Sequence, residues 1–171
     1  MFLSIIKKVS LKKNVKKHLS KVKAPSGNKI TTVNLLIDGI HFNETTQLID
    51  EFVKRGIKKE NIKALILIKE KTRINTDAII YLRSQDIGLF GAISKEEVRA
   101  FVSQKSDLLV NYYKEEKPEL DYIASKANSD FKAGFFTEKN AINHLSIDSS
   151  LSDYKIFSEE MFKYLKAFNK I

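Results

Sequence analysis

Two kinds of hydrophobic pattern alternate along this chain, one typical of buried strands and the other of amphipathic helices. Apolar runs rich in β-branched residues predict strands, because such side chains suit a pleated and covered surface. These strands are expected at residues 30–37, 62–68, 107–112 and 131–136, with shorter ones at 78–82 and 142–147. Residues 87–93 are expected to form either a further short strand or a loop.

Apolar residues at helical spacing predict four helices between and after the strands. Their expected starts are Asn43, Ser94, Pro118 and Ser158. Gly56 is expected to end the first of these helices in a conformation with positive φ. Ser94 and Glu97 have the spacing of a capping box, and Pro118 suits a first helical turn.

Strands that alternate with helices of this length indicate an α/β fold, since parallel neighbours in a sheet need helical crossovers. The chain has 171 residues, of which 43% are hydrophobic, so it can bury one full core. We therefore predict one three-layer, Rossmann-like α/β domain with a mostly parallel sheet at residues 29–171. A basic amphipathic helix at residues 1–23 is expected to precede this domain.

The N-terminal segment has two apolar stripes when its side chains are placed around a helix. The first stripe is Phe2, Ile5, Ile6 and Val9, and the second is Leu11, Val15, Leu19 and Val22. Because the stripes are out of line, a bend is expected near Ser10. The sequence Ala-Pro-Ser-Gly-Asn at residues 24–28 is typical of a helix stop, so we expect a hinge between arm and domain there.

Positive charge is concentrated in the same N-terminal segment, which contains eight lysines and no acidic residue. The whole chain has 30 basic and 21 acidic side chains, so the remainder, with 22 against 21, is nearly neutral. The lysines are Lys7, Lys8, Lys12, Lys13, Lys16, Lys17, Lys21 and Lys23. Such a run attracts polyanions, which makes these side chains candidate contacts for a phosphate backbone or an acidic lipid surface.

Several protein classes do not fit the composition. The chain has no cysteine, which excludes disulfides and thiolate metal sites and makes a cytoplasmic protein the default expectation. No apolar run approaches the roughly 20 residues of a spanning helix. Apolar residues precede the lysines, the reverse of a signal peptide, so secretion is not expected. Association with a membrane surface remains open.

Candidate ligand-binding residues fall where two strands are expected to end. In an open α/β sheet, ligands bind at the carboxyl ends of the strands. The residues placed there are Asp38, His41, Asn111, Tyr112 and Tyr113. A structural role is the alternative for each of them, because Asp-Gly is a common turn and tyrosines at this spacing are often core residues. The sequence has neither glycine-rich phosphate loop nor metal-ligand spacing, so no cofactor and no metal are expected.

The chain carries two resemblances. Its basic start, KITTVNLLIDG, DLLVNYY, ASKANSDFKAGF and FKYLKAFNKI resemble an uncharacterised family of small bacterial proteins, a domain of unknown function, which implies no activity. DLLVNYY followed by IASKANSDFKAGF is also similar to part of the heptosyltransferase-like glycosyltransferases. That likeness implies a Rossmann-like fold, but the chain has no matching donor-site residues.

Three functions are compatible with these observations. The leading hypothesis is a non-enzymatic domain that binds RNA or a ribonucleoprotein surface such as the ribosome through its lysines. The alternative is a peripheral membrane protein whose apolar anchor is Phe2, Leu3, Ile5 and Ile6. The third hypothesis is a small-molecule or nucleotide-sugar binding protein or enzyme built around Asp38. A protein partner that covers the first apolar stripe is also compatible with the sequence.

Overall fold

Six parallel strands form one sheet in the order β3-β2-β1-β4-β5-β6. The structure is a computed structural model, and it describes residues 1–21, 24–70, 74–138 and 141–171. The strands are β1 (Val33–Asp38), β2 (Ile62–Leu67), β3 (Ile79–Leu82), β4 (Ser106–Tyr112), β5 (Ser129–Phe135) and β6 (Leu145–Ile147). The chain moves outward from β1 to β3 and then returns to the other side of β1. This order confirms the predicted α/β domain.

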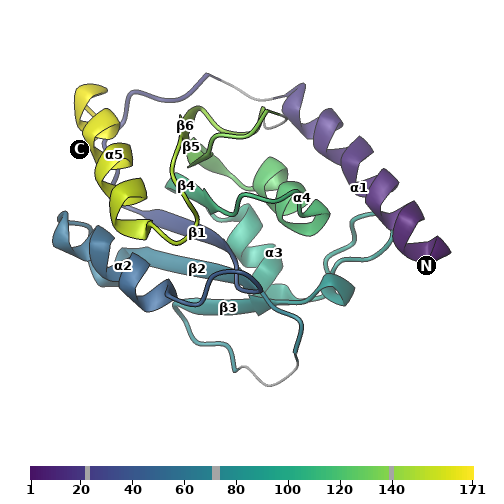
Figure 1. Ribbon diagram of the computed structural model, residues 1–171. Coiled ribbons are helices and arrows are strands. Elements are labelled where there is room, and N and C mark those ends of the chain that lie inside the picture. Colours follow the sequence, from purple (N-terminus) through teal and green to yellow (C-terminus); the bar gives the residue numbers. More distant parts are fainter. Residues whose placement is uncertain (22–23, 71–73, 139–140) are drawn as a thin grey trace.

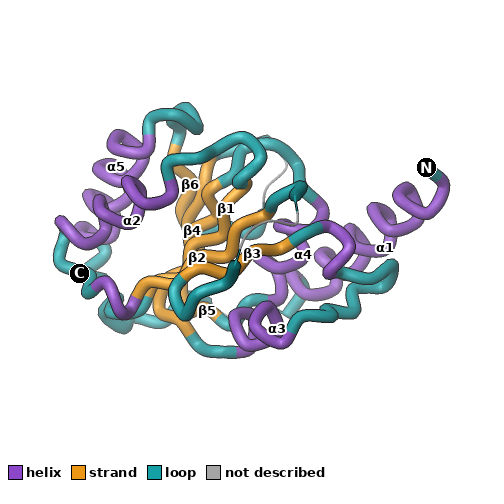
Figure 2. Tube along the Cα trace, turned by 90° about the horizontal axis from the view of Figure 1, so that it is seen from below, coloured by secondary structure: helices purple, strands orange, loops and turns teal. Residues whose placement is uncertain are grey.

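Helices cover both faces of the sheet and complete a three-layer fold (Figure 1). Helices α2 (Thr45–Lys54) and α5 (Tyr154–Ala167) lie on one face. Helices α1 (Phe2–Leu19), α3 (Glu96–Ser103) and α4 (Pro118–Lys126) lie on the other, as the view along the sheet shows (Figure 2). Two short 3-10 helices, η1 (Lys59–Asn61) and η2 (Ser84–Asp86), complete the regular structure of the described residues.

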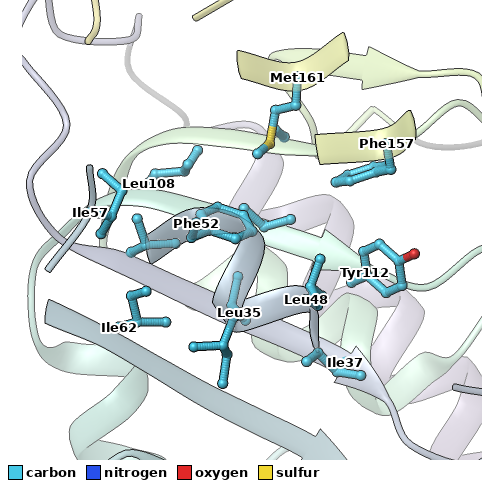
Figure 3. Close-up of a cluster of buried hydrophobic side chains, with 14 of the residues drawn as sticks. Leu35, Ile37, Leu48, Phe52, Ile57, Ile62, Leu108, Tyr112, Phe157 and Met161 are labelled. Atoms are coloured by element: carbon cyan, nitrogen blue, oxygen red, sulfur yellow. The ribbon is translucent and has the colours of Figure 1, made fainter. Parts of the chain in front are cut away.

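The central strand is buried along its whole length, because both faces of a parallel sheet are covered by helices. Leu35 and Ile37 of β1 pack toward α2 and α5, whereas Leu36 between them packs toward α3 and α4. In the first of these cores the ring of Tyr112 meets Phe157 edge to face, with 5.0 Å between the ring centroids (Figure 3). Successive side chains of a strand point to opposite faces of the sheet, so the strand divides the core into two halves.

Helix α2 has Glu44 as its N-cap in place of the expected Asn43. Two further helix starts differ from the prediction. The capping box at Ser94 is absent, because the hydroxyl of Ser94 donates to the carbonyl of Asp86 and the N-cap of α3 is Lys95. Helix α5 begins at Tyr154, four positions before the expected Ser158. Ser158 is instead fully buried inside the helix. Tertiary contacts have overridden the local start signals in both places.

Residues 87–93 form a tight loop instead of a strand of the sheet. Ile87 and Ile93 make one isolated antiparallel bridge, and the turn between them closes with a hydrogen bond from Gly91 N to Gly88 O. Gly91 has φ of 90°, and a Cβ atom there would lie 2.5 Å from the hydroxyl of Tyr122. Gly91 thus permits the tight bend.

The N-terminal segment is one continuous helix that runs through Ser10, the position of the expected bend. Leu11 is completely buried in the second core, and Val15 and Leu19 pack against that core. The second stripe predicted from the sequence is therefore the docked face of α1, which lies beside α4 (Figure 1). Val22, the last member of that stripe, and Lys23 lie outside the described residues. That residues 24–28 act as a hinge stays a prediction.

Candidate functional site

The inward face of α1 is attached to the domain by polar contacts as well as by its apolar stripe. The ammonium group of Lys7 donates to the carbonyl and the hydroxyl of Ser84 and lies 3.2 Å from Glu119 Oε1. Near the C-terminal end of α1, His18 Nδ1 is 3.2 Å from the hydroxyl of Ser125. Burial, followed by the neighbouring lysines, lowers the pKa of His18, which keeps its ring neutral at pH 7. Lys7 is thus a structural contact and is not available to a polyanion.

The outward face of α1 exposes the first apolar stripe. Phe2, Ile5 and Val9 are 74%, 57% and 63% exposed, Leu3 is 62% exposed, and Ile6 is half-buried. Phe90 adds an aromatic ring that is 77% exposed, in a loop whose backbone carbonyl accepts a hydrogen bond from the Asn14 side chain. Single exposed apolar residues are common on monomeric proteins, whereas several on one helix face make that face a candidate interaction surface.

The exposed lysines continue this surface toward the end of the helix. Lys8, Lys13, Lys16, Lys17 and Lys21 are exposed and have no ion pair within the part of the chain that the structure describes. Lys12 differs, since its ammonium group lies 2.5 Å from Glu116 Oε1. We call the exposed apolar residues Phe2, Leu3, Ile5 and Val9, together with the five unpaired lysines, the α1 outer face. It is apolar in its first half and basic in its second.

At the carboxyl edge of the sheet, the fold brings Asp38 and His41 together. Asp38 is 1% exposed, and its Oδ2 atom lies 2.7 Å from His41 Nδ1 and 3.4 Å from the ammonium group of Lys117. Its other oxygen accepts a hydrogen bond from the backbone N–H of Ile40. This is an Asx turn with two added side-chain partners, so both carboxylate oxygens are already engaged.

The other three residues predicted at this edge are buried in the domain. Asn111 donates to Asn143 Oδ1 at 2.7 Å, and Tyr112 donates to the carbonyl of Leu151 at 2.7 Å. Tyr113 donates to Asp121 Oδ1 at 2.9 Å. Burial raises the pKa of both tyrosines. Tyr112 and Tyr113 are 0% and 4% exposed, so neither presents a ring face on which a base can stack.

A cavity of about 640 Å³ lies between α1 and the loops that follow β4 and β5. Its lining residues from α1 are Lys12, Val15, Lys16 and Leu19. Tyr113 and Asp121 contribute from the other side. Burial raises the pKa of Asp121 to about 6. We call this space the α1 cavity. Asp121 was not recognised as a site residue from the sequence, because its place in the cavity depends on the docking of α1.

The described residues contain neither a metal-binding cluster nor a membrane-spanning helix. They include no group of three or more His, Asp or Glu side chains arranged to hold a metal ion. No helix in the described ranges has both the length and the apolar character needed to cross a bilayer.

The strand order and the covering helices define a single α/β domain that is consistent with a Rossmann-like fold. Residues 7–168 match a family of unknown function, DUF6913, and the chain belongs to this family. No curated protein matches the chain, and no solved structure matches it either. The comparisons thus supply a family without an activity.

Proposed function

We propose that this protein is a peripheral membrane protein that docks on anionic lipid through the α1 outer face. The observation that carries this proposal is the order of residues on that face, where exposed apolar side chains come first and unpaired lysines follow. Phe2, Ile5 and Val9 are more than half exposed and point away from the core that Leu11 enters. An interfacial helix needs both components, apolar side chains for the acyl boundary and cations for the head groups.

The docking of α1 on α4 supports this proposal physically. The buried side chain of Leu11 and the ion pair of Lys7 with Glu119 hold the helix on the domain, so the outer face is folded before it meets a partner. Binding then avoids most of the entropy cost of ordering a disordered segment. Each lysine near an anionic leaflet contributes about 1 kcal/mol, so the five unpaired lysines supply a substantial electrostatic attraction.

RNA binding is the second candidate, and it is favoured by a separate observation. The exposed lysines Lys13, Lys16, Lys17 and Lys21 extend beyond the apolar residues and lack acidic partners among the described side chains. A phosphate backbone is recognised by such charges alone, with a strong dependence on salt. This candidate leaves the exposed Phe2, Ile5 and Val9 without a role, and for that reason it ranks second.

The remaining hypothesis, a nucleotide or nucleotide-sugar site at Asp38, has less support. A carboxylate that binds ribose must offer a free oxygen, whereas both oxygens of Asp38 have partners within the protein. The loop after β1 also lacks the glycine pattern that lets backbone N–H groups approach a phosphate.

Co-sedimentation with vesicles tests the membrane proposal directly. The full chain is mixed with vesicles of phosphatidylcholine alone, with vesicles that also contain phosphatidylglycerol, and with ribosomes. The triple variant Phe2→Ser, Ile5→Ser, Val9→Ser removes the apolar part of the face. We expect binding to the anionic vesicles only, and we expect the triple variant to lose at least about tenfold in affinity.

Two matched controls test whether the loss of binding is specific to the α1 outer face. Each control changes the same types of residue elsewhere on the protein. Val53→Ser, Ile74→Ser, Ile156→Ser removes three exposed apolar residues away from α1 and is expected to bind as the natural protein does. Neutralising Lys8, Lys13, Lys16 and Lys17 to Gln should weaken binding, whereas neutralising Lys58, Lys59, Lys155 and Lys166 to Gln should not. Ribosome binding that survives the triple α1 variant, without vesicle binding, would replace the membrane proposal with the RNA candidate.

A further inference from the structure

The α1 cavity has the size and the lining of a small-molecule site. Its volume of about 640 Å³ lies within the range of about 300 to 1,000 Å³ that is usual for ligand pockets. Apolar side chains in the lining come from Val15, Leu19, Pro118 and Ile142. The cavity also opens beside the segments that follow β4 and β5, the edge of a parallel sheet at which ligands bind.

Among the described residues that line this cavity, one charged side chain is less exposed than the others. Asp121 is partly buried, whereas the other charged lining residues that the structure describes are exposed. These exposed residues are Lys12, Lys16, Lys114, Glu115, Glu116 and Glu138. Within the described lining, apolar walls are therefore combined with one partly buried carboxyl group, an arrangement that fixes the orientation of a small ligand.

Asp121 has unused capacity to bind a cation. Its Oδ1 atom accepts the hydrogen bond from Tyr113, and its Oδ2 atom has no hydrogen-bond partner among the residues that the structure describes. No ion pair to Asp121 is found there either, and the nearby ammonium group of Lys12 is paired with Glu116. A carboxylate in apolar surroundings without a cation is costly, and a ligand that supplies the cation removes part of this cost.

From this geometry we propose that the α1 cavity binds a small apolar amine, with its ammonium group on Asp121 and its apolar body against Val15, Leu19 and Ile142. An ammonium group donates charge-assisted hydrogen bonds to a carboxylate, which an alcohol of the same shape does not match. A carboxylic acid of that shape would instead be repelled by Asp121. The raised pKa of Asp121 agrees with this view, since burial of the carboxyl group is its largest cause.

This inference goes beyond the proposed membrane function and is tested separately from it. Phenethylamine and octylamine are compared with 2-phenylethanol, 1-octanol and octanoate by NMR titration of the full chain at pH 7.5. We expect both amines to shift the signals of Val15, Tyr113 and Ile142, with affinities at least about tenfold higher than the matching alcohols. Octanoate is expected to bind less tightly than 1-octanol.

Asp121→Asn is the decisive variant, because it keeps an acceptor for the Tyr113 hydroxyl and removes only the charge. The amines should then bind no more tightly than the alcohols. Glu138→Gln makes the same change at the exposed rim and should alter amine affinity by no more than about twofold. Equal binding of amines and alcohols to the natural protein, absence of binding, or an equal loss in both variants would overturn the proposal.

Discussion

The hydroxyl of Tyr113 donates a hydrogen bond of 2.9 Å to Oδ1 of Asp121, joining the end of β4 to α4 beside the α1 cavity. Tyr113 follows the last residue of β4, and its ring belongs to the second core. The contact therefore connects the packing of the sheet to a partly buried carboxyl group of the cavity. Burial of this carboxyl group raises its pKa and makes the stability of the protein depend on pH, which the sequence did not indicate.

Asp121 should make the protein more stable in mild acid. Burial raises its pKa from 3.8 to about 6, the hydrogen bond from Tyr113 opposes this shift, and Glu116, Lys12 and Glu119 act through their charges. Between these two values the folded state binds more protons than the unfolded state, so stability decreases as pH rises through this window. The effect is about 1 to 3 kcal/mol for a partly buried carboxyl group.

Chemical denaturation of Asp121→Asn across a pH series measures this effect. The variant should be more stable than the natural protein at pH 8, and the difference should shrink as the pH falls toward 4. An identical pH profile for the two proteins would show that Asp121 has an ordinary pKa in the folded state.

Asp107 should act in the opposite direction. Burial alone would raise its pKa, but hydrogen bonds from the backbone N–H groups and hydroxyls of Thr31 and Thr32 outweigh burial and hold the pKa below 3.8. The stability from these bonds is complete above the unfolded pKa and is lost as pH falls through the folded pKa. Asp107→Asn should cost about 1 to 3 kcal/mol at pH 7.

The stability measured at acid pH distinguishes the effect of Asp107 from that of Asp121. Asp107→Asn should lose less stability than the natural protein when the pH falls from 5 to 2. If the variant loses as much stability as the natural protein over this pH range, other carboxylates cause the loss.

Leu11 should be the residue that holds α1 on the domain. Its side chain is completely buried, and truncation to Ala should cost about 2 to 5 kcal/mol if α1 unfolds with the domain. Val9→Ala is the control on the same helix, since Val9 is 63% exposed and should change stability by less than about 0.5 kcal/mol.

Hydrogen exchange shows which structure is lost. Faster exchange in α1 alone would indicate a helix that detaches separately, whereas faster exchange throughout would indicate one cooperative unit. Unchanged exchange and stability in Leu11→Ala would contradict the docked position of α1.

Substitution of three glycines by Ala should distinguish the cost of backbone strain from the cost of a steric clash. Gly91 combines φ of 90° with a Cβ position 2.5 Å from the Tyr122 hydroxyl, whereas Gly56 has φ of 96° and open space around it. Gly27 has neither constraint. Substitution by Ala should therefore cost most at Gly91, about 1 kcal/mol at Gly56 and almost nothing at Gly27. Thermal unfolding of the three variants gives this order, and equal costs at Gly91 and Gly56 would remove the clash from the explanation.

Much of the fold could be predicted because its signals are local. A strand buried on both faces, such as residues 33–38, needs a continuous apolar run, and that run is readable without knowledge of its neighbours. Gly56 was recognised for the same reason, and it has the positive φ that was expected. The start of α5 was missed because Tyr154 and Ile156 precede the strongest apolar spacing and carry no helix-start signal.

The candidate sites show the same difference between local signals and contacts made by the tertiary structure. The sequence placed Asp38 and His41 at one strand end, and three positions of separation were enough to bring them within 2.7 Å. The sequence also predicted the lysines as candidate contacts for a polyanion. It did not distinguish Lys7, which contacts Ser84 and Glu119, from exposed lysines such as Lys13.

The sequence by itself therefore determined the class of fold, the position of most strands and the concentration of charge in the first helix. These properties follow from the spacing and type of residues that are close together in the chain. Only the tertiary structure decided which stripe of α1 is buried, which lysines are free and that Asp121 lies in a cavity. The reason is physical, because burial and ion pairing depend on neighbours that the order of strands brings together from distant parts of the chain.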